Sequence, residues 1–295
     1  MRGLVAVAKS TALEILSEPL TLLVTLAALV IAVLAPAFHY HQFGEATRMA
    51  RDAGFSALFT CGSIVAVFGT IRAFRREMES GTIQMALSHP VSRGGFFIAK
   101  SFGAFLAYLA FAVTVFGTSL TIIEGARVGG AIAARTGDVA RLSGPFFAAG
   151  VAIMLFPMLL GAVLNRFARF RFVLTSTVTG LALAMVAGGV SAVLDPALLP
   201  RYAPVAVLLL SPALVLLFAS AAFAVRFRAN AAAAAAGVVA ALCIPAVGNY
   251  YMADALSNGG EVFWVYVAFA SLAALPAVLA FALLGIRLIG GRDVS

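Results

Sequence analysis

Eight stretches of this chain are long and apolar enough to cross a lipid bilayer, and this repetition constrains the fold more than any other feature. A spanning helix needs about 20 predominantly apolar residues, and inside lipid only helices or closed barrels satisfy all their backbone hydrogen bonds. The sequence therefore predicts an all-α polytopic membrane protein, with residues 1–295 forming a single transmembrane domain. The predicted spans are residues 20–38, 53–71, 96–123, 146–164, 172–194, 203–225, 231–252 and 262–286.

Two short basic breaks, at residues 165–171 and 226–230, leave the helix count open. Each can join two helices in a hairpin, or mark a kinked or re-entrant element. Six full spans plus a re-entrant hairpin within residues 172–252 would keep the preceding loops on the same sides. We therefore expect about eight transmembrane helices, with six plus a hairpin as the alternative.

The composition supports lipid as the main solvent of this chain. Of its residues 63% are apolar and only 11% are charged, whereas soluble domains carry about 25% charged residues. The net charge of +8 does not coincide with a polar run of basic and aromatic residues, so no nucleic-acid partner is expected. Cys61 and Cys243 each lie in an apolar stretch, which gives no support for a disulfide framework.

The basic residues predict the orientation. With eight spans and the N-terminus inside, most of the 20 Lys and Arg residues fall in cytoplasmic segments, as the positive-inside rule requires. An odd number of spans would place the later basic clusters on the wrong side. We expect a multi-pass protein of the cytoplasmic (inner) membrane with both termini in the cytoplasm.

Two segments outside the spans have recognisable patterns. Residues 1–18 predict a helix lying on the inner membrane surface, because apolar residues recur at helical spacing opposite Lys9 and Glu14. The alternative is a polar overhang of the first span, from which Pro19 separates it. Residues 124–145 form the longest polar stretch on the predicted outer side. They are rich in Gly and Ala, contain no catalytic constellation, and predict short helices or a loop.

The segment most informative about function is the cytoplasmic connection at residues 72–95. It contains two helical patterns separated by Gly81 and closed by Pro90, where a simple connector would need only a few residues. Thr82 can cap the second short helix, and Ser92 can cap the following span. The second pattern carries Leu87 and other apolar residues, too few to cross the membrane but suited to a helix docked on a partner.

Charged residues begin this segment. Glu77 and Glu79 can pair locally with Arg75 and Arg76, or reach charges on a partner protein. The alternative is an amphipathic loop in which Arg72 and the two neighbouring arginines bind anionic lipid headgroups.

The same segment resembles the first cytoplasmic loop of type-2 ABC-transporter permeases. The resemblance covers residues 77–100 and is greatest to the branch that contains the permease for copper-site maturation of nitrous oxide reductase. It rests on Glu77-Met-Glu79-Ser-Gly81-Thr82, then Leu87-Ser-His-Pro90-Val-Ser92-Arg93, and then a Phe-rich helix start with Lys100.

The resemblance implies a mechanism and a set of partners. In such permeases this loop forms a coupling helix in a cleft of a separate ABC-type ATPase subunit, and two permease chains, identical or paralogous, join two ATPases. ATP and Mg would bind to the ATPase, since this sequence contains no Gly-x-x-x-x-Gly-Lys-Ser/Thr loop. The residues that the resemblance assigns to coupling are Glu77, Glu79, Gly81, Thr82, Leu87, Pro90 and Arg93.

The remaining polar residues discriminate between functions. The predicted spans lack Asp, Glu or His at mid-depth, which ion-coupled carriers need. The sequence therefore favours a transporter that receives its energy through the cytoplasmic segment at residues 72–95 over an ion-coupled carrier. His39 and His41 could join a metal site, as could Met154 and Met158, but packing explains both pairs more simply. The alternative function is a non-ABC membrane protein, an embedded enzyme or a scaffold, whose basic loop binds lipid.

Overall fold

Helices make up nearly all of the structure. The computed structural model describes residues 2–37, 46–79, 92–137, 142–228, 231–239 and 263–290, and within these residues it contains no strand. Seven of the described helices are long and apolar enough to cross a membrane. The predicted all-α polytopic membrane protein is therefore confirmed.

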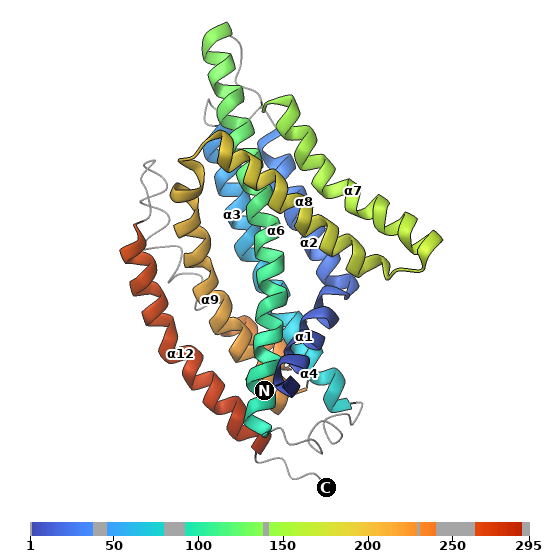
Figure 1. Cartoon of the computed structure of the whole chain (residues 1–295). Helices are drawn as coiled ribbons and strands as arrows, with labels where there is room; N and C mark the ends of the chain where they lie inside the picture. Colours follow the sequence, from blue (N-terminus) through green and yellow to red (C-terminus); the bar gives the residue numbers. More distant parts are fainter. Residues whose placement is uncertain are drawn as a thin grey trace. The chain divides into compact units, whose positions relative to one another are not determined.

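In chain order the helices (Figure 1) are α1 (Arg2–Leu16), α2 (Pro19–Leu34), η1 (Ala35–Ala37), α3 (Ala46–Ile64), η3 (Val65–Gly69), α4 (Thr70–Glu79), α6 (Arg93–Thr136), α7 (Gly144–Ala168), α8 (Phe172–Leu194), α9 (Leu198–Arg226) and α12 (Trp264–Gly290).

The predicted spans correspond closely to these helices. The fifth span and α8 have identical bounds. The second span is the middle of one helical run in which α3, the π-helical turn η3 and α4 follow one another without a break. The predicted seventh span, 231–252, lies mostly outside the described residues; its first part, 231–239, is helical.

Helix α6 differs most from its prediction. It contains 44 residues and therefore extends about 66 Å, roughly twice the hydrocarbon thickness of a bilayer. Residues 124–136, which we predicted as part of an outer loop or short helices, continue this helix. The stretch lacks a proline that would end the helix, and packing supports it, because Gly125 lies directly against Phe146 of α7. The helix ends where Gly137 adopts a left-handed backbone with φ of 75°, a common helix terminator.

Contacts divide the chain into two compact units. The first comprises residues Met1–Ile15, Ser63–Tyr108 and Ala203–Ser295, and the second comprises Leu16–Gly62 and Leu109–Tyr202. The helical run from α3 to α4, α6 and α9 each contribute residues to both.

In the second unit α7 and α8 form a helical hairpin, packed side by side (Figure 1). Its turn is tight because Arg169 adopts a left-handed φ of 56° and Asn165 Nδ2 donates a hydrogen bond of 2.8 Å to the Phe170 carbonyl. The basic break at residues 165–171 is thus a hairpin turn. Both α8 and α9 are long enough to span fully, which favours full spans over a re-entrant element here.

Small residues allow close backbone contact in the second unit. Gly188 of α8 lies against Gly117 of α6, and a Cβ added at Gly188 would stand 2.8 Å from the Gly117 Cα. In lipid the hydrophobic effect does not drive helices together. Close packing between small residues therefore supplies much of the energy that holds these helices to one another. The neighbouring Gly189 has no atom within 4 Å of its added Cβ.

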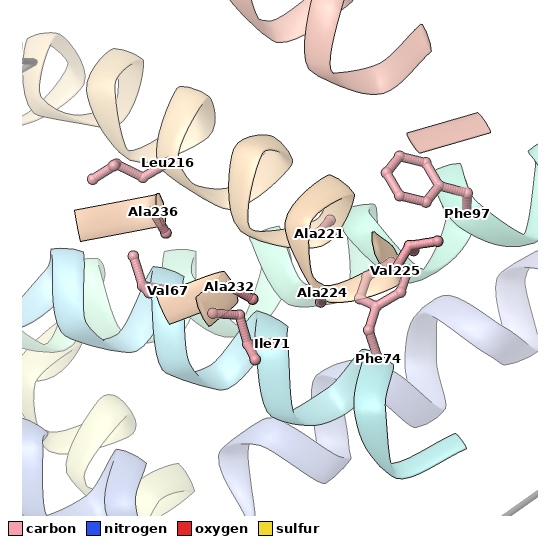
Figure 2. Close-up of a cluster of buried hydrophobic side chains, with 10 residues drawn as sticks. All are labelled: Val67, Ile71, Phe74, Phe97, Leu216, Ala221, Ala224, Val225, Ala232 and Ala236. Atoms are coloured by element: carbon pink, nitrogen blue, oxygen red, sulfur yellow. The ribbon is translucent and has the colours of Figure 1, made fainter. Parts of the chain in front are cut away.

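The first unit has an apolar core in which alanines pack among larger side chains (Figure 2). Val67, Ile71 and Phe74 come from η3 and α4, and Phe97 comes from α6. Leu216, Val225 and two alanines of α9, with two alanines of residues 231–239, complete it. Ala232 and Ala236, in the alanine-rich run that begins at residue 231, are both fully buried.

Helix α1 belongs to the first unit and ends before Pro19, as predicted. Ala8 and Ile15 are buried, while Val5 is 67% exposed, so apolar side chains occupy both faces. Gly103 of α6 lies directly against the Ala8 backbone, and a Cβ there would approach the Thr11 Cβ to 2.8 Å. The predicted position of this helix on a membrane surface stays a prediction.

The close contact between α6 and α8 can be tested with adjacent glycines. Gly188→Ala should destabilise the protein by about 1–3 kcal/mol, because the new methyl group overlaps the Gly117 backbone. Gly189→Ala should be neutral or slightly stabilising, since alanine has the higher helix propensity. Thermal unfolding in detergent measures both. Equal effects of the two substitutions would contradict this packing.

Candidate functional site

The candidate site comprises the helix ends that flank residues 80–91. Helix α4 leads into this segment and α6 leaves it. Gly81, Thr82, Leu87 and Pro90, which the sequence assigned to coupling, lie outside the described residues, as does the side chain of Glu79. The structure describes Glu77 and Arg93 in full, together with several side chains that the sequence did not single out for coupling.

The start of α6 is capped as predicted. Ser92 Oγ accepts a hydrogen bond of 3.1 Å from the backbone N–H of Gly95, which satisfies one of the free N–H groups at the helix start. Arg93 then donates to the carbonyl of Gly290, at 3.0 Å from its Nη1. Because Gly290 ends α12, a cation here also favours the helix dipole.

A buried ion pair joins α4 to α6. Lys100 is fully buried, and its Nζ lies 2.8 Å from Glu77 Oε1, whose side chain is 26% exposed. The approach does not meet hydrogen-bond geometry for Nζ, so we describe the contact as an ion pair. The ammonium also lies 5.6 Å and 5.9 Å from the ring centroids of Phe74 and Phe96, within the range of cation–π attraction.

This partner of Glu77 was not predicted from the sequence. The sequence suggested pairing with neighbouring arginines or with another protein, and Lys100 entered only as part of the motif that resembles the permease family. A signal was present, because a lysine inside an apolar helix almost always has a polar or charged partner. Sequence spacing could not show which carboxylate that partner is.

Two arginines of α4 also contact other helices. Arg76 Nη1 lies 3.2 Å from Glu14 Oε1 of α1, and Arg75 Nη1 donates at 3.0 Å to the carbonyl of Phe227, just after α9. These contacts are exposed and individually weak. They nevertheless show that α4 does not present its arginines only to lipid.

Helices α9 and α12 run parallel within the first unit. Ser211 and Ser271 hydroxyls are 3.1 Å apart, and the rings of Phe223 and Phe281 are 5.7 Å apart. The residue just after α9, Phe227, contacts Arg75 of α4, and the end of α12 at Gly290 contacts Arg93 of α6.

We call the charged contacts of α4 and α6 beside residues 80–91 the loop base. The loop base consists of Arg75, Arg76, Glu77, Arg93 and Lys100 with the partners given above.

A second polar cluster lies in the second unit. Glu124 of α6 is 1% exposed and accepts two hydrogen bonds from Arg127, at 2.8 Å and 2.6 Å. Arg127 Nε also lies 3.3 Å from Asp195 Oδ2 at the end of α8. This cluster was not predicted from the sequence, in which residues 124–145 formed a separate outer segment. Both carboxylates face the same guanidinium, so the arrangement holds α6 to α8 and offers no acid–base pair.

The proposed metal ligands can be placed only in part. Met154 packs against the cluster of Leu29, Ile153 and Ala184, in agreement with a packing role. Among the described residues no three His, Cys, Asp or Glu side chains group as a metal site would require. His39 and His41 lie outside them.

These features define a multi-pass membrane protein whose charged contacts gather beside the connection between its second and third spans. The family model of the ABC-2 family transporter protein matches residues 17–187. The chain belongs to this family and is accordingly a membrane subunit of an ABC transporter rather than an enzyme.

The match covers residues 72–95 in full, but it gives no support to the nitrous oxide reductase branch. A comparison with curated proteins finds no match, and a comparison with solved structures finds none either.

The burial of the ion pair predicts unequal effects of removing its two members. Glu77→Gln should cost about 3 kcal/mol of stability, because it leaves a fully buried ammonium without its counter-charge. Lys100→Met should cost less than about 1 kcal/mol, since the remaining carboxylate is partly exposed and methionine suits an apolar site. Thermal unfolding in detergent compares them, and the reverse order would contradict the assigned burial.

Proposed function

We propose that this chain is the permease of a transporter whose ATP is hydrolysed by a separate ABC-type ATPase subunit, with residues 80–91 as the coupling helix. Family membership supports a membrane subunit, and the sequence has no phosphate-binding loop of its own. In this proposal ATP and Mg bind to the ATPase. A second copy or a paralogue of this chain completes the membrane part.

The loop base is the observation that carries the coupling assignment. Each helix that flanks residues 80–91 is tied by charged groups to another helix. Arg75 ties α4 to the end of α9, and Arg93 ties α6 to the end of α12. Arg76 also ties α4 to α1, so a displacement of residues 80–91 by a partner would reach five helices. Glu79, Gly81, Thr82, Leu87 and Pro90 are proposed to contact the ATPase or to shape the coupling helix.

The orientation belongs to the proposal as well. We place the loop base and both termini in the cytoplasm of a cell with an inner membrane, as the positive-inside rule suggests. Helices α9 and α12 are parallel, so we propose one further crossing between them. The predicted span at residues 231–252 would supply that crossing and would make the total eight.

The buried charges favour a transporter that does not depend on an ion gradient. Lys100 and Glu124, both fully buried, are each neutralised by a neighbouring side chain, and buried Arg51 lies 2.9 Å from Asp52. Ion-coupled carriers instead need ionisable groups free to exchange protons or to bind cations. We therefore propose ATP-driven export of an apolar or amphipathic substrate.

Co-purification tests the proposed partner. The wild-type permease should retain an ATPase subunit encoded beside its gene and should stimulate ATP hydrolysis by it. Glu79→Ala and Gly81→Pro should reduce that stimulation at least about fivefold, because they alter the proposed coupling helix. Thr136→Ala, at the exposed end of α6, is the control and should behave as wild type. Normal association and stimulation by both loop variants would refute the coupling assignment.

Cysteine labelling tests the orientation independently of the ATPase. In inside-out and right-side-out vesicles, a single cysteine at Ser80 should react from the cytoplasmic side and one at Asp138 from the other side. The native Cys61 and Cys243 are replaced by alanine for this measurement. Reaction of both sites from the same side would exclude the proposed topology.

A further inference from the structure

We infer that the Glu77–Lys100 ion pair is a latch that fixes the end of α4 to the start of α6, so that both helices move as one body when residues 80–91 are displaced. This inference rests on the proposed function. It assigns a positioning role to Lys100 and gives Glu77 an internal role in place of a contact with the ATPase.

The pair is placed where such a latch is needed. Residues 80–91 leave α4 shortly after Glu77 and enter α6 shortly before Lys100, so the pair closes the base of this connection. The rings of Phe74 and Phe97, 5.4 Å apart, form an apolar contact between the same two helices. An apolar contact alone resists separation but tolerates sliding, since it has little directional preference.

The charges specify one arrangement of α4 on α6. Lys100 has no exposed surface, so its ammonium favours a position in which a carboxylate is close. The residues directly before Glu77 on α4 are Arg75 and Arg76. With about 100° between successive residues, a rotation of α4 one way would bring the like-charged Arg76 toward the ammonium, and a rotation the other way would bring the uncharged Met78. The pair therefore favours one rotational position of α4 by attraction, and neither neighbouring position supplies a carboxylate.

Stability alone does not account for a lysine at this position. A well-packed apolar pair of similar volume is often as stable as a buried ion pair, or more so. Burial also shields this pair from salt, unlike the exposed Arg76–Glu14 contact. Within the loop base, the Glu77–Lys100 pair is the buried contact. It joins α4 directly to α6, the two helices that adjoin residues 80–91.

The first experiment measures the latch without any partner. Full-length permease lacking native cysteines is reconstituted in lipid nanodiscs and spin-labelled at Arg72 on α4 and Ile98 on α6, which are both exposed. Electron–electron distance measurements should give one narrow distribution. Glu77→Gln and Lys100→Met should broaden it, and the exchanged pair Glu77→Lys with Lys100→Glu should restore it. Lys9→Met, the same change at an exposed site on α1, should leave it unchanged.

The second experiment measures coupling in the complex with the ATPase that co-purifies with wild type. Lys100→Met and Glu77→Gln should bind the usual amount of ATPase yet lower permease-dependent ATP hydrolysis at least about fivefold, and the exchanged pair should recover it. If single variants fold poorly, the apolar pair Glu77→Leu with Lys100→Met replaces them. It should be stable but uncoupled.

The outcomes separate the latch from the proposed function. Unchanged distance distributions in the variants would overturn the latch, as would normal coupling by the apolar pair. A wild-type permease that retains no ATPase would instead refute the proposed function, and the distance measurements would still decide whether the two helices are latched.

Discussion

The structure depends first on the absence of water around most of the chain. Inside lipid an unpaired backbone N–H or C=O costs several kcal/mol, so each crossing segment forms its hydrogen bonds within itself as a helix. This requirement explains why the described residues are almost entirely helical, and why polar breaks are short. It also removes the usual driving force for folding, because lipid tails are as apolar as the side chains that meet them. The helices must therefore be held together by other means.

Close packing and paired charges provide those means. Gly117 and Gly188 bring two backbones into contact, as Gly103 does against α1. The first unit uses alanines of α9 and residues 231–239 in the same way (Figure 2). Charged residues add directional contacts where they are buried: Lys100 with Glu77, and Glu124 with Arg127. In each case one fully buried member meets a more exposed one, so part of the pair keeps its hydration and the cost of burial is limited.

The distribution of charges also connects the fold to transport. The proposed coupling needs a mechanical path from residues 80–91 to the spans of this ABC-2 family transporter protein. In this chain side chains join the ends of five helices around one connection. The buried charges described elsewhere are neutralised in place. A mechanical input at the loop base is more consistent with this arrangement than a chain of proton-exchanging groups.

Most of the helices could be predicted from the sequence, since the length and apolar character of a span are local properties. Family resemblance likewise lay in a short linear motif, and the Ser92 cap in a local hydrogen bond.

Tertiary structure decided what local patterns cannot express. The extension of α6 to Thr136 reflects a continuous helix where polarity suggested a loop. The pairing of Lys100 with Glu77, and of Arg127 with Asp195, depends on which helices are neighbours. The sequence by itself determined that this chain crosses a membrane as helices, because every apolar stretch in lipid must pair its own backbone N–H and C=O groups, whatever its neighbours. Only the packed structure determined which charges meet, because that depends on distances between residues far apart in the chain.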